Sequence, residues 1–405
     1  MTPAAPARPL SRNREFGALW VGQTISEFGT SLSAFAYPLL VLALTGSAFQ
    51  AGLVGTVLAS TTFVLRLPAG AWADRLDRRR LMLASDAGRA LALVSIPIAD
   101  LLGGLTVGHI LAVAVVEGAL GVVFGPAEAA AVRRVVAADQ VRDAVARNQI
   151  RAQVAGLLGP IAGGALFTLG RAVPFACDAL SYALSFVWVR TIRTPLRADA
   201  EDAGRRRLAA EIREGLSCWW RDGFLRAAAL WLAGIGVAFS SIGLVILVLA
   251  LESGAGAGQL GVMSALTASG GFVGALLAPW LQARCRPGVL LVAFGWLAAA
   301  VAALIVVFRS PYALGVLGAA AFLLFPAVNA VVFGHLAATV PDRLQGRANA
   351  AVRQVTMMLM PVGPVVAGLL IDTGGPVTTA AIYAAALTTL AVTATATKAI
   401  RAFAT

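Results

Sequence analysis

Two carboxyl groups, Glu27 and Glu117, lie near the middle of long apolar stretches of this chain. A carboxyl group in apolar surroundings is held neutral, and it ionises when water or a cation reaches it. An ionised acid at the centre of a lipid bilayer costs about 2.5–3.5 kcal/mol on insertion scales, so acids found there usually serve a function. The chemistry that we expect of Glu27 and Glu117 is proton binding from one side of a membrane and proton release to the other.

Polar residues accompany Glu27 at helical spacing and form one stripe with it. They are Gln23, Thr24, Thr30 and Ser31. A polar stripe on a membrane helix faces a cavity or another helix rather than lipid. The second half of the chain has no acid at comparable depth, and its inward polar candidates are Ser240, Ser241 and Asn329.

Each of these assignments has an alternative. The alternative for Glu27 and for Glu117 is a neutral acid that is hydrogen bonded to a neighbouring helix. The alternative for Asp178 as a proton carrier is a structural pair with Arg171. Both halves contain aromatic residues that could line a cavity for a bulky amphipathic or aromatic ligand. The alternative for each of them is packing between helices of the bundle. They are Trp20, Phe35, Trp231, Phe239 and Phe325.

The elements that must position these residues are twelve apolar stretches. The chain has 405 residues, of which 59% are hydrophobic and 13% charged, and its mean hydropathy is +0.82. About 20 apolar residues span a bilayer as a helix, and the stretches lack the alternation of a membrane barrel. We expect an all-α membrane protein with helices at about 16–44, 47–73, 81–103, 107–133, 148–170, 172–192, 224–251, 257–282, 288–308, 310–338, 347–371 and 375–397.

The charge distribution predicts the orientation. The net charge is +12, and all but four of the 32 Lys and Arg residues fall in the terminal tails and alternate connections. This bias predicts that both termini lie in the cytoplasm and that the positive charge faces anionic lipid rather than nucleic acid. The four exceptions are Arg66, Arg89, Arg171 and Arg309.

Several classes of function are excluded by what the chain lacks. Cys177, Cys218 and Cys285 lie in separate segments, and His109 and His335 are isolated, so we expect neither a disulfide framework nor a metal site nor a cofactor. An intramembrane enzyme would need a Ser–His pair, paired aspartates or a zinc motif, and none is present. The first apolar run is too long for a removable signal peptide.

The chain divides into two halves that repeat each other. We expect a bundle of six helices over 1–192, a cytoplasmic linker over 193–222, within which 211–220 forms an interfacial helix or a solvated segment, and a second bundle over 223–405. FGPAE at 124–128 and ARNQIR at 146–151 correspond to FPAVN at 325–329 and GRANAAVR at 346–353. Such repeats are typical of transporters in which two bundles rock around a site near the midplane.

The loop after the second helix carries a recognisable pattern. Residues 70–80 read GAWADRLDRRR, which resembles the loop signature of the major facilitator superfamily, G-x-x-x-D-R-x-G-R-R, with Asp77 in place of a glycine. Gly70 permits close approach of a helix, and Asp74 can accept hydrogen bonds from a helix N-terminus. The resemblance implies a cytoplasmic latch that includes Arg75 and Arg79, with Asp74 facing the helix that starts near Gly346. The alternative is that the positive charge of this loop serves only to orient the chain in the membrane.

A further group of charges belongs to the same expected gate. Asp86 and Arg89 lie three residues apart on one helical face and can pair with each other or with the loop arginines. Charges inside a membrane helix are rarely unpaired. We therefore assign Asp86, Arg89 and Glu128 to the gating network, together with Arg66, which lies one turn before Gly70.

The fifth apolar stretch carries a second pattern. Residues 155–164 read AGLLGPIAGG, in which Gly159, Pro160, Gly163 and Gly164 match the exporter signature g-x-x-x-G-P-x-x-G-G of the superfamily. Ala155, Gly159 and Gly163 form a small-residue face that suits close helix packing, and Pro160 bends the helix. The resemblance implies efflux rather than uptake.

Several strings resemble one subgroup more closely, the macrolide-efflux and enterobactin-exporter-like drug and siderophore exporters. They are GQTISEFG at 22–29, ADRLDRRR at 73–80, SDAGR at 85–89, PAE at 126–128, DALSY at 178–182 and GRAN at 346–349. In this fold helices one and four line the cavity, which would bring Glu27 and Glu117 together to share a proton.

The resemblance thus implies a multi-pass transporter of the plasma membrane, expected as a monomer, that exports a hydrophobic or amphipathic small molecule by proton antiport with alternating access. The alternative is an importer or facilitator of the same fold.

Overall fold

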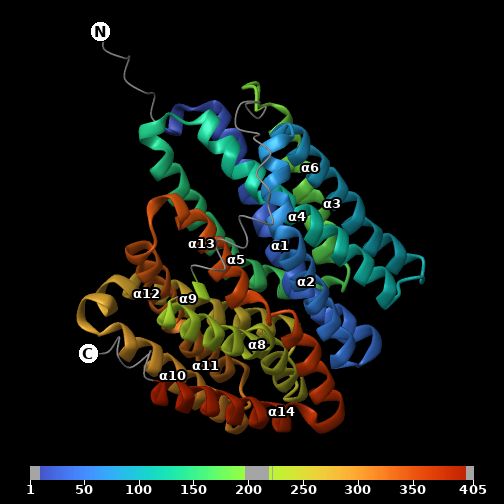
Figure 1. Cartoon of the computed structure of the whole chain (residues 1–405). Helices are drawn as coiled ribbons and strands as arrows, with labels where there is room; N and C mark the ends of the chain where they lie inside the picture. The colour runs from blue at the N-terminus through green and yellow to red at the C-terminus, as the bar shows by residue number, and fades with distance from the viewer. Residues whose placement is uncertain (1–9, 197–218, 221, 398–405) are drawn as a thin grey trace. The chain divides into compact units, whose positions relative to one another are not determined.

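The computed structural model describes residues 10–196, 219–220 and 222–397. Within these residues the chain consists of helices and short connections, without a β-strand (Figure 1). The segment at 211–220, predicted to be an interfacial helix or a solvated linker, lies outside the described residues except for Trp219 and Trp220.

Six long helices make up the first half of the described chain. They are α1 (Arg14–Thr45), α2 (Ala48–Arg75), α3 (Arg78–Leu101), α4 (Val107–Val135), α5 (Val141–Leu169) and α6 (Val173–Arg190), with short 3-10 helices at Leu10–Arg12 and Ala138–Gln140. Each corresponds to one predicted stretch. The largest difference is at α5, which begins seven residues before the predicted start at 148, so that its first two turns are polar.

Seven helices are described in the second half of the chain. They are α8 (Gly223–Glu252), α9 (Ala257–Arg284), α10 (Pro287–Val307), α11 (Pro311–Leu323), α12 (Phe325–Thr339), α13 (Asp342–Met357) and α14 (Val362–Ala396). Helices α11 and α12 form one predicted crossing that is interrupted at Leu324, two residues before Pro326, because proline cannot continue the backbone hydrogen bonding. Within α14, Gly375 has a φ of 80° and divides two crossings where the sequence predicts the division.

Ten segments of the described residues are long and apolar enough to cross a membrane, and one of them, Leu344–Ala396, contains the break at Gly375. Helix α6, with 18 residues, adds a further crossing. The protein is therefore a multi-pass α-helical membrane protein, with the twelve crossings that the hydropathy pattern predicts.

Side chains cap the starts of several helices. Asp77, which replaces a glycine of the loop signature, accepts a hydrogen bond from the Arg80 N–H at 3.2 Å and caps α3. Asp222 caps α8 through the Leu225 N–H at 2.9 Å and also contacts His335 Nε2 at 2.9 Å. Burial opposes ionisation of Asp222, but the hydrogen bonds from Leu225 and His335 lower its pKa below the usual value.

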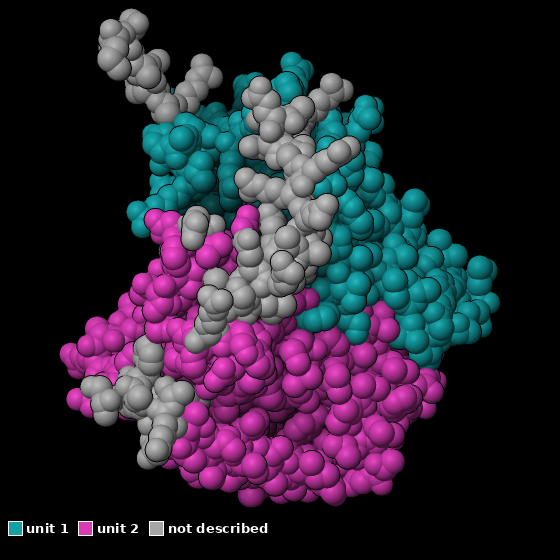
Figure 2. Space-filling model, in the orientation of Figure 1, with its two compact units in different colours: residues 1–37, 60–204 teal, residues 38–59, 205–405 magenta. Residues whose placement is uncertain are grey.

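The chain forms two compact units, coloured separately in Figure 2: unit 1 comprises residues 1–37 and 60–204, and unit 2 comprises residues 38–59 and 205–405. In unit 1, α3 packs against both α4 and α6; in unit 2, α14 packs against α8 and α10, and α9 against α11. Each unit has its own apolar core, which includes Met82 and Phe124 in unit 1 and Leu291 and Phe294 in unit 2.

A cap on α2 explains why residues 38–59 belong to unit 2. The Asp372 carboxylate accepts hydrogen bonds from the Ala48 N–H at 2.8 Å, the Phe49 N–H at 3.1 Å and the Ser47 hydroxyl at 2.7 Å. A carboxylate at this position satisfies N–H groups that have no partner within the helix and favours the positive end of the helix dipole. Gly368 allows the close approach, since a Cβ there would overlap the backbone of Ala48.

Candidate functional site

Helix α1 carries the predicted polar stripe and is held on two sides by glycine contacts within unit 1. Towards α6, a Cβ on Gly22 would lie 2.9 Å from the Trp188 Cβ. Towards α5, a Cβ on Gly159 would overlap the side chain of Ser31, and one on Gly163 would lie 3.1 Å from the Leu32 carbonyl oxygen. The small-residue face of α5 therefore packs directly on α1, which places the polar residues of α1 against those of α5 and α6.

The first charged cluster joins α1, α4 and α5. Arg151 Nη2 lies 3.0 Å from Glu128 Oε1 and 3.5 Å from Glu27 Oε2. The Arg151 side chain is 4% exposed and that of Glu128 14%, whereas that of Glu27 is 40% exposed. Two carboxyl groups thus share one buried guanidinium, and Glu27 is the member of the cluster with the most open surface.

A second set of polar contacts lies between α1, α3 and α6. The Gln23 amide donates to the Ser185 hydroxyl at 2.9 Å, and that hydroxyl donates to Asp86 Oδ2 at 2.6 Å. All three side chains are buried. Asp86 interacts electrostatically with both Arg89 and Glu128, so it lies between the Arg151 cluster and the next one.

The third cluster is centred on Arg89 of α3. Its guanidinium lies 3.8 Å from the centroid of the Tyr182 ring and hydrogen bonds to the Tyr182 hydroxyl and, at 3.3 Å, to Thr30 Oγ1. It also interacts electrostatically with Glu117, Asp178 and Asp86. Three carboxyl groups therefore surround one buried guanidinium.

The two remaining acids of this cluster are bonded to hydroxyl groups. Glu117 Oε2 accepts a hydrogen bond from the Tyr37 hydroxyl at 2.6 Å, and Asp178 accepts from Ser33 and, at 3.0 Å, from Ser181. Glu117 and Asp178 are both buried. Their carboxyl groups are near enough to each other to interact electrostatically.

Together these residues form one network, which we call the unit-1 charge network. It consists of Glu27, Asp86, Arg89, Glu117, Glu128, Arg151 and Asp178. Five acids face two guanidinium groups inside a helical bundle. Full ionisation of all five acids would leave uncompensated negative charge inside the bundle, which is unfavourable in a membrane.

Two expectations about these acids are wrong in this structure. Glu27 and Glu117 do not come together: Glu27 is bound to Arg151, while Glu117 is bound to Tyr37 and interacts with Arg89. Asp178 does not pair with Arg171, because Arg171 binds Asp100 Oδ1 at 2.6 Å. Two other polar residues of the α1 stripe bond within their own helix: Thr24 donates to the Trp20 carbonyl and Ser31 to the Glu27 carbonyl.

The predicted latch residues lie at the end of α2 and the start of α3. A Cβ on Gly70 would meet no atom within 4 Å, so among the described residues of unit 1 no helix makes the predicted close approach. Asp74 and Arg75 are exposed, and Arg79 donates to the Arg190 carbonyl at 2.5 Å. The predicted contact between Asp74 and the helix that starts near Gly346 joins the two units and stays a prediction.

Unit 2 contains an apolar cavity of about 420 Å³. Asn329 lines it, as do the predicted aromatic residues Phe239 and Phe325. Ser240 and Ser241, predicted to face a cavity, donate to the Val237 carbonyl within their own helix and are not among the residues that line this cavity. Of the other aromatic candidates, Trp231 and Phe35 are buried, and the Trp231 indole donates to the Leu390 carbonyl at 2.8 Å.

Two arginines that contact these sites, Arg151 and Arg353, were not predicted as site residues. From the sequence they were assigned to the basic connections between helices, but the structure places them about ten residues inside α5 and α13. Tyr37 and Tyr182 were also missed. The repeat itself was the available signal, since Arg151 and Arg353 end the corresponding strings at 146–151 and 346–353.

Within the described residues no group of three or more His, Cys, Asp or Glu side chains could hold a metal ion. Twelve crossings, two units and a buried charge network are together typical of a membrane transporter.

Comparison with known proteins identifies the family. The chain matches the Major Facilitator Superfamily over residues 19–336 and belongs to it. It is 27% identical over 387 residues to the multidrug efflux pump Tap of Mycolicibacterium fortuitum, covering 89% of this chain and 88% of that protein. It is 24% identical over 352 residues to the enterobactin exporter EntS of Citrobacter koseri, covering 84% and 81%.

The fold agrees with this assignment. The nucleoside transporter NupG superposes with a TM-score of 0.78 at 11% identity, covering 94% of this chain and 98% of that one. The protein therefore has the major facilitator fold, with twelve transmembrane helices in two six-helix bundles, as predicted.

Proposed function

We propose that this protein is a secondary active exporter of hydrophobic or amphipathic small molecules, driven by proton antiport, with both termini in the cytoplasm of a cell whose plasma membrane it spans. The observation that carries the proposal is the excess of acids in the unit-1 charge network. The exporter pattern at Gly159 and Pro160 and the names of the two relatives, a multidrug pump and a siderophore exporter, support export as the direction.

The geometry suggests how protons would pass. Glu27, with 40% of its side chain exposed, is the most accessible acid of the Arg151 cluster, and it shares Arg151 with Glu128. Asp86 connects this cluster to Arg89, Glu117 and Asp178. Protonation of Glu27 leaves Glu128 as the sole partner of Arg151, so a proton alters the pairing between α1 and α5 without leaving a guanidinium bare. Such a change can bias a bundle between two arrangements.

The test is transport into everted membrane vesicles that contain the protein. An imposed gradient, acidic inside, should drive the uptake of fluorescent hydrophobic dyes of differing charge, and a protonophore should abolish it. Glu27→Gln and Glu117→Gln should each reduce gradient-driven uptake about tenfold or more, because a neutral amide cannot exchange a proton.

The matched control is Asp100→Asn, which removes a carboxyl group that is also paired with an arginine but lies outside the unit-1 charge network. It should retain most of the uptake. Uptake that ignores the pH gradient, or that survives both the Glu27 and the Glu117 change, would show that these acids do not couple transport to protons.

A further inference from the structure

The cavity of about 420 Å³ in unit 2 is lined in part by aromatic side chains. Its aromatic side chains come from α8, α11 and α12, and they are Phe239, Phe322, Phe325 and Phe333. The ring centroids of Phe239 and Phe322 lie 4.9 Å apart, nearly perpendicular, and those of Phe239 and Phe325 lie 6.2 Å apart in a stacked arrangement. Rings in these orientations offer both faces and edges to a further aromatic ring.

One cation projects among these rings. The Arg353 guanidinium lies 4.7 Å above the centroid of Phe333, and Arg353 lines the cavity beside Asn329. A guanidinium stacked on an aromatic ring keeps its N–H groups in the plane, available to an oxygen acceptor. Arg353 is itself an exposed residue, so these donors are open to the cavity.

No acid balances this charge from the cavity walls. None of the residues that line the cavity is acidic. Between 223 and 397 the acids are Glu252, Asp342 and Asp372, and Asp342, at the start of the same helix, is eleven residues from Arg353. At 1.5 Å per residue that separation is about 16 Å along the axis.

Unit 1 shows what the corresponding arginine does when an acid is present. There Arg151 binds Glu128 at 3.0 Å. In the repeat, FPAVN at 325–329 corresponds to FGPAE at 124–128, so Asn329 stands where unit 1 has Glu128, and Arg353 stands where it has Arg151. Unit 2 has kept the arginine and replaced the carboxylate by a neutral amide. An arginine inside a membrane helix is costly to insert without a counter-charge, and here the counter-charge has to come from elsewhere.

We propose that this cavity binds substrates that carry an anionic group on an aromatic ring system, with the acidic group on Arg353 and Asn329 and the ring among Phe239, Phe322 and Phe325. The volume of about 420 Å³ suits a molecule of two or three fused or linked rings. A charge-assisted contact to a guanidinium is about twice as strong as a neutral hydrogen bond. The proposal rests on the proposed export function, and it names the class of compound exported.

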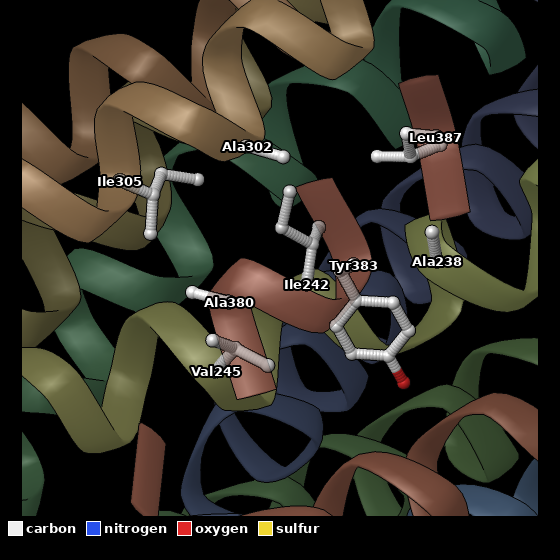
Figure 3. A pocket seen from close by; sticks show the side chains of 8 residues that line it. All are labelled: Ala238, Ile242, Val245, Ala302, Ile305, Ala380, Tyr383 and Leu387. Carbon is white, nitrogen blue, oxygen red and sulfur yellow. The ribbon is translucent and has the colours of Figure 1, made fainter. Parts of the chain in front are cut away.

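A second apolar cavity described in unit 2 does not suit a ligand. Figure 3 shows side chains of α8, α10 and α14, such as Ile242, Ile305 and Leu387, around it. Its volume is about 10 Å³, at most enough for one water molecule, and the Tyr383 hydroxyl is the only polar side-chain group among the residues that line it.

The test compares three naphthyl probes of nearly equal size with different charge, namely 1-naphthylacetate, 2-(1-naphthyl)ethanol and 2-(1-naphthyl)ethylamine. Binding to the purified full-length protein in detergent is measured by equilibrium dialysis. The anion should bind at least tenfold more tightly than the alcohol, and the amine most weakly. Arg353→Gln should remove the preference for the anion, with a loss of about 10- to 100-fold in its affinity and little change for the alcohol.

Two further variants separate charge from structure. Arg353→Lys keeps the charge and should retain a reduced preference for the anion, which shows that a loss in Arg353→Gln is not a folding defect. Arg284→Gln removes an exposed arginine that also stacks on an aromatic ring, Trp280 at 5.0 Å, outside the cavity, and should change nothing.

The outcomes distinguish this inference from the proposed function. If the vesicles export dyes under a pH gradient but Arg353→Gln binds the three probes as the unaltered protein does, the anion site is wrong and the exporter stands. If the anion binds through Arg353 but no gradient-driven transport occurs, the site stands and proton-driven export is wrong. Equal affinity of the unaltered protein for all three probes also overturns the anion site.

Discussion

At the scale of single residues, the side chain that holds the first cluster together is Arg151. It is the guanidinium shared by Glu27 and Glu128, and it is nearly completely buried. Breaking a buried ion pair by removing one partner is costly, about 3–5 kcal/mol, because the remaining charge has no compensation. The stability of unit 1 and the proton coupling that we propose for it therefore depend on the same side chain.

Arg151→Gln should destabilise the protein by about 3–5 kcal/mol at neutral pH, where Glu27 and Glu128 would lose their cation. The measurement is the thermal denaturation midpoint of the purified protein in detergent. Addition of Glu128→Gln to Arg151→Gln should recover part of the loss, since the double variant no longer buries a bare carboxylate.

The control is Arg171→Gln. The Arg171 side chain is 42% exposed where it binds Asp100, and exposed pairs contribute about 0–1 kcal/mol. Equal destabilisation by Arg171→Gln and Arg151→Gln would contradict a special role for the buried arginine.

The sequence identifies most acids of this network but not their partners. Glu27, Glu117 and Asp86 stand out because a charge in an apolar run is unfavourable wherever it points. Arg151 does not stand out, because it follows a polar stretch that reads as a connection. Which acid meets which arginine depends on helix rotation and packing, and these are fixed by contacts among residues far apart in the chain.

At the scale of the elements, the packing of α1 between α5 and α6 decides where the polar stripe lies. Helices without a hydrophobic driving force between them associate through small residues that let the backbones approach closely. Gly159 meets Ser31 on α1, whereas Gly156, on the same helix one turn earlier, has nothing within 4 Å of a Cβ position.

These two glycines provide a matched pair of substitutions. Gly159→Ala should destabilise the protein by about 1–3 kcal/mol, because the added methyl overlaps the Ser31 side chain and lies 3.3 Å from its Cα. Gly156→Ala should be neutral or stabilise it by about 0.5–1 kcal/mol through helix propensity. Thermal denaturation of both variants checks the difference, and a milder effect at Gly159 than at Gly156 would contradict the packing described.

The helices themselves were predictable because bilayer thickness sets a minimum apolar length, and the break between the last two crossings falls at Gly375, as the sequence predicts. The start of α5 was not predictable, because Arg142, Asp143 and Arg147 make its first turns polar. The interruption at Leu324 was not predicted either. It lies next to Pro326, and hydropathy does not show whether a proline in an apolar stretch bends the helix or breaks it.

At the scale of the whole molecule, the charge of +12 is the strongest global signal. The basic residues gather in the tails and in alternate connections, and such an asymmetry sets the orientation of a multi-pass protein. The turn between α3 and α4 carries no basic residue, whereas the connection between α4 and α5 is flanked by Arg133, Arg134 and Arg142. The first turn should therefore lie outside the cell and the second inside.

Single cysteines in a background with Cys177, Cys218 and Cys285 replaced by serine test this orientation. Leu102, in the turn between α3 and α4, is 80% exposed, and Asp139, between α4 and α5, is also exposed. A membrane-impermeant maleimide added to intact cells should label Leu102→Cys at once and Asp139→Cys only after permeabilisation. The reverse pattern would place the termini outside the cell and would contradict the orientation predicted from the distribution of basic residues.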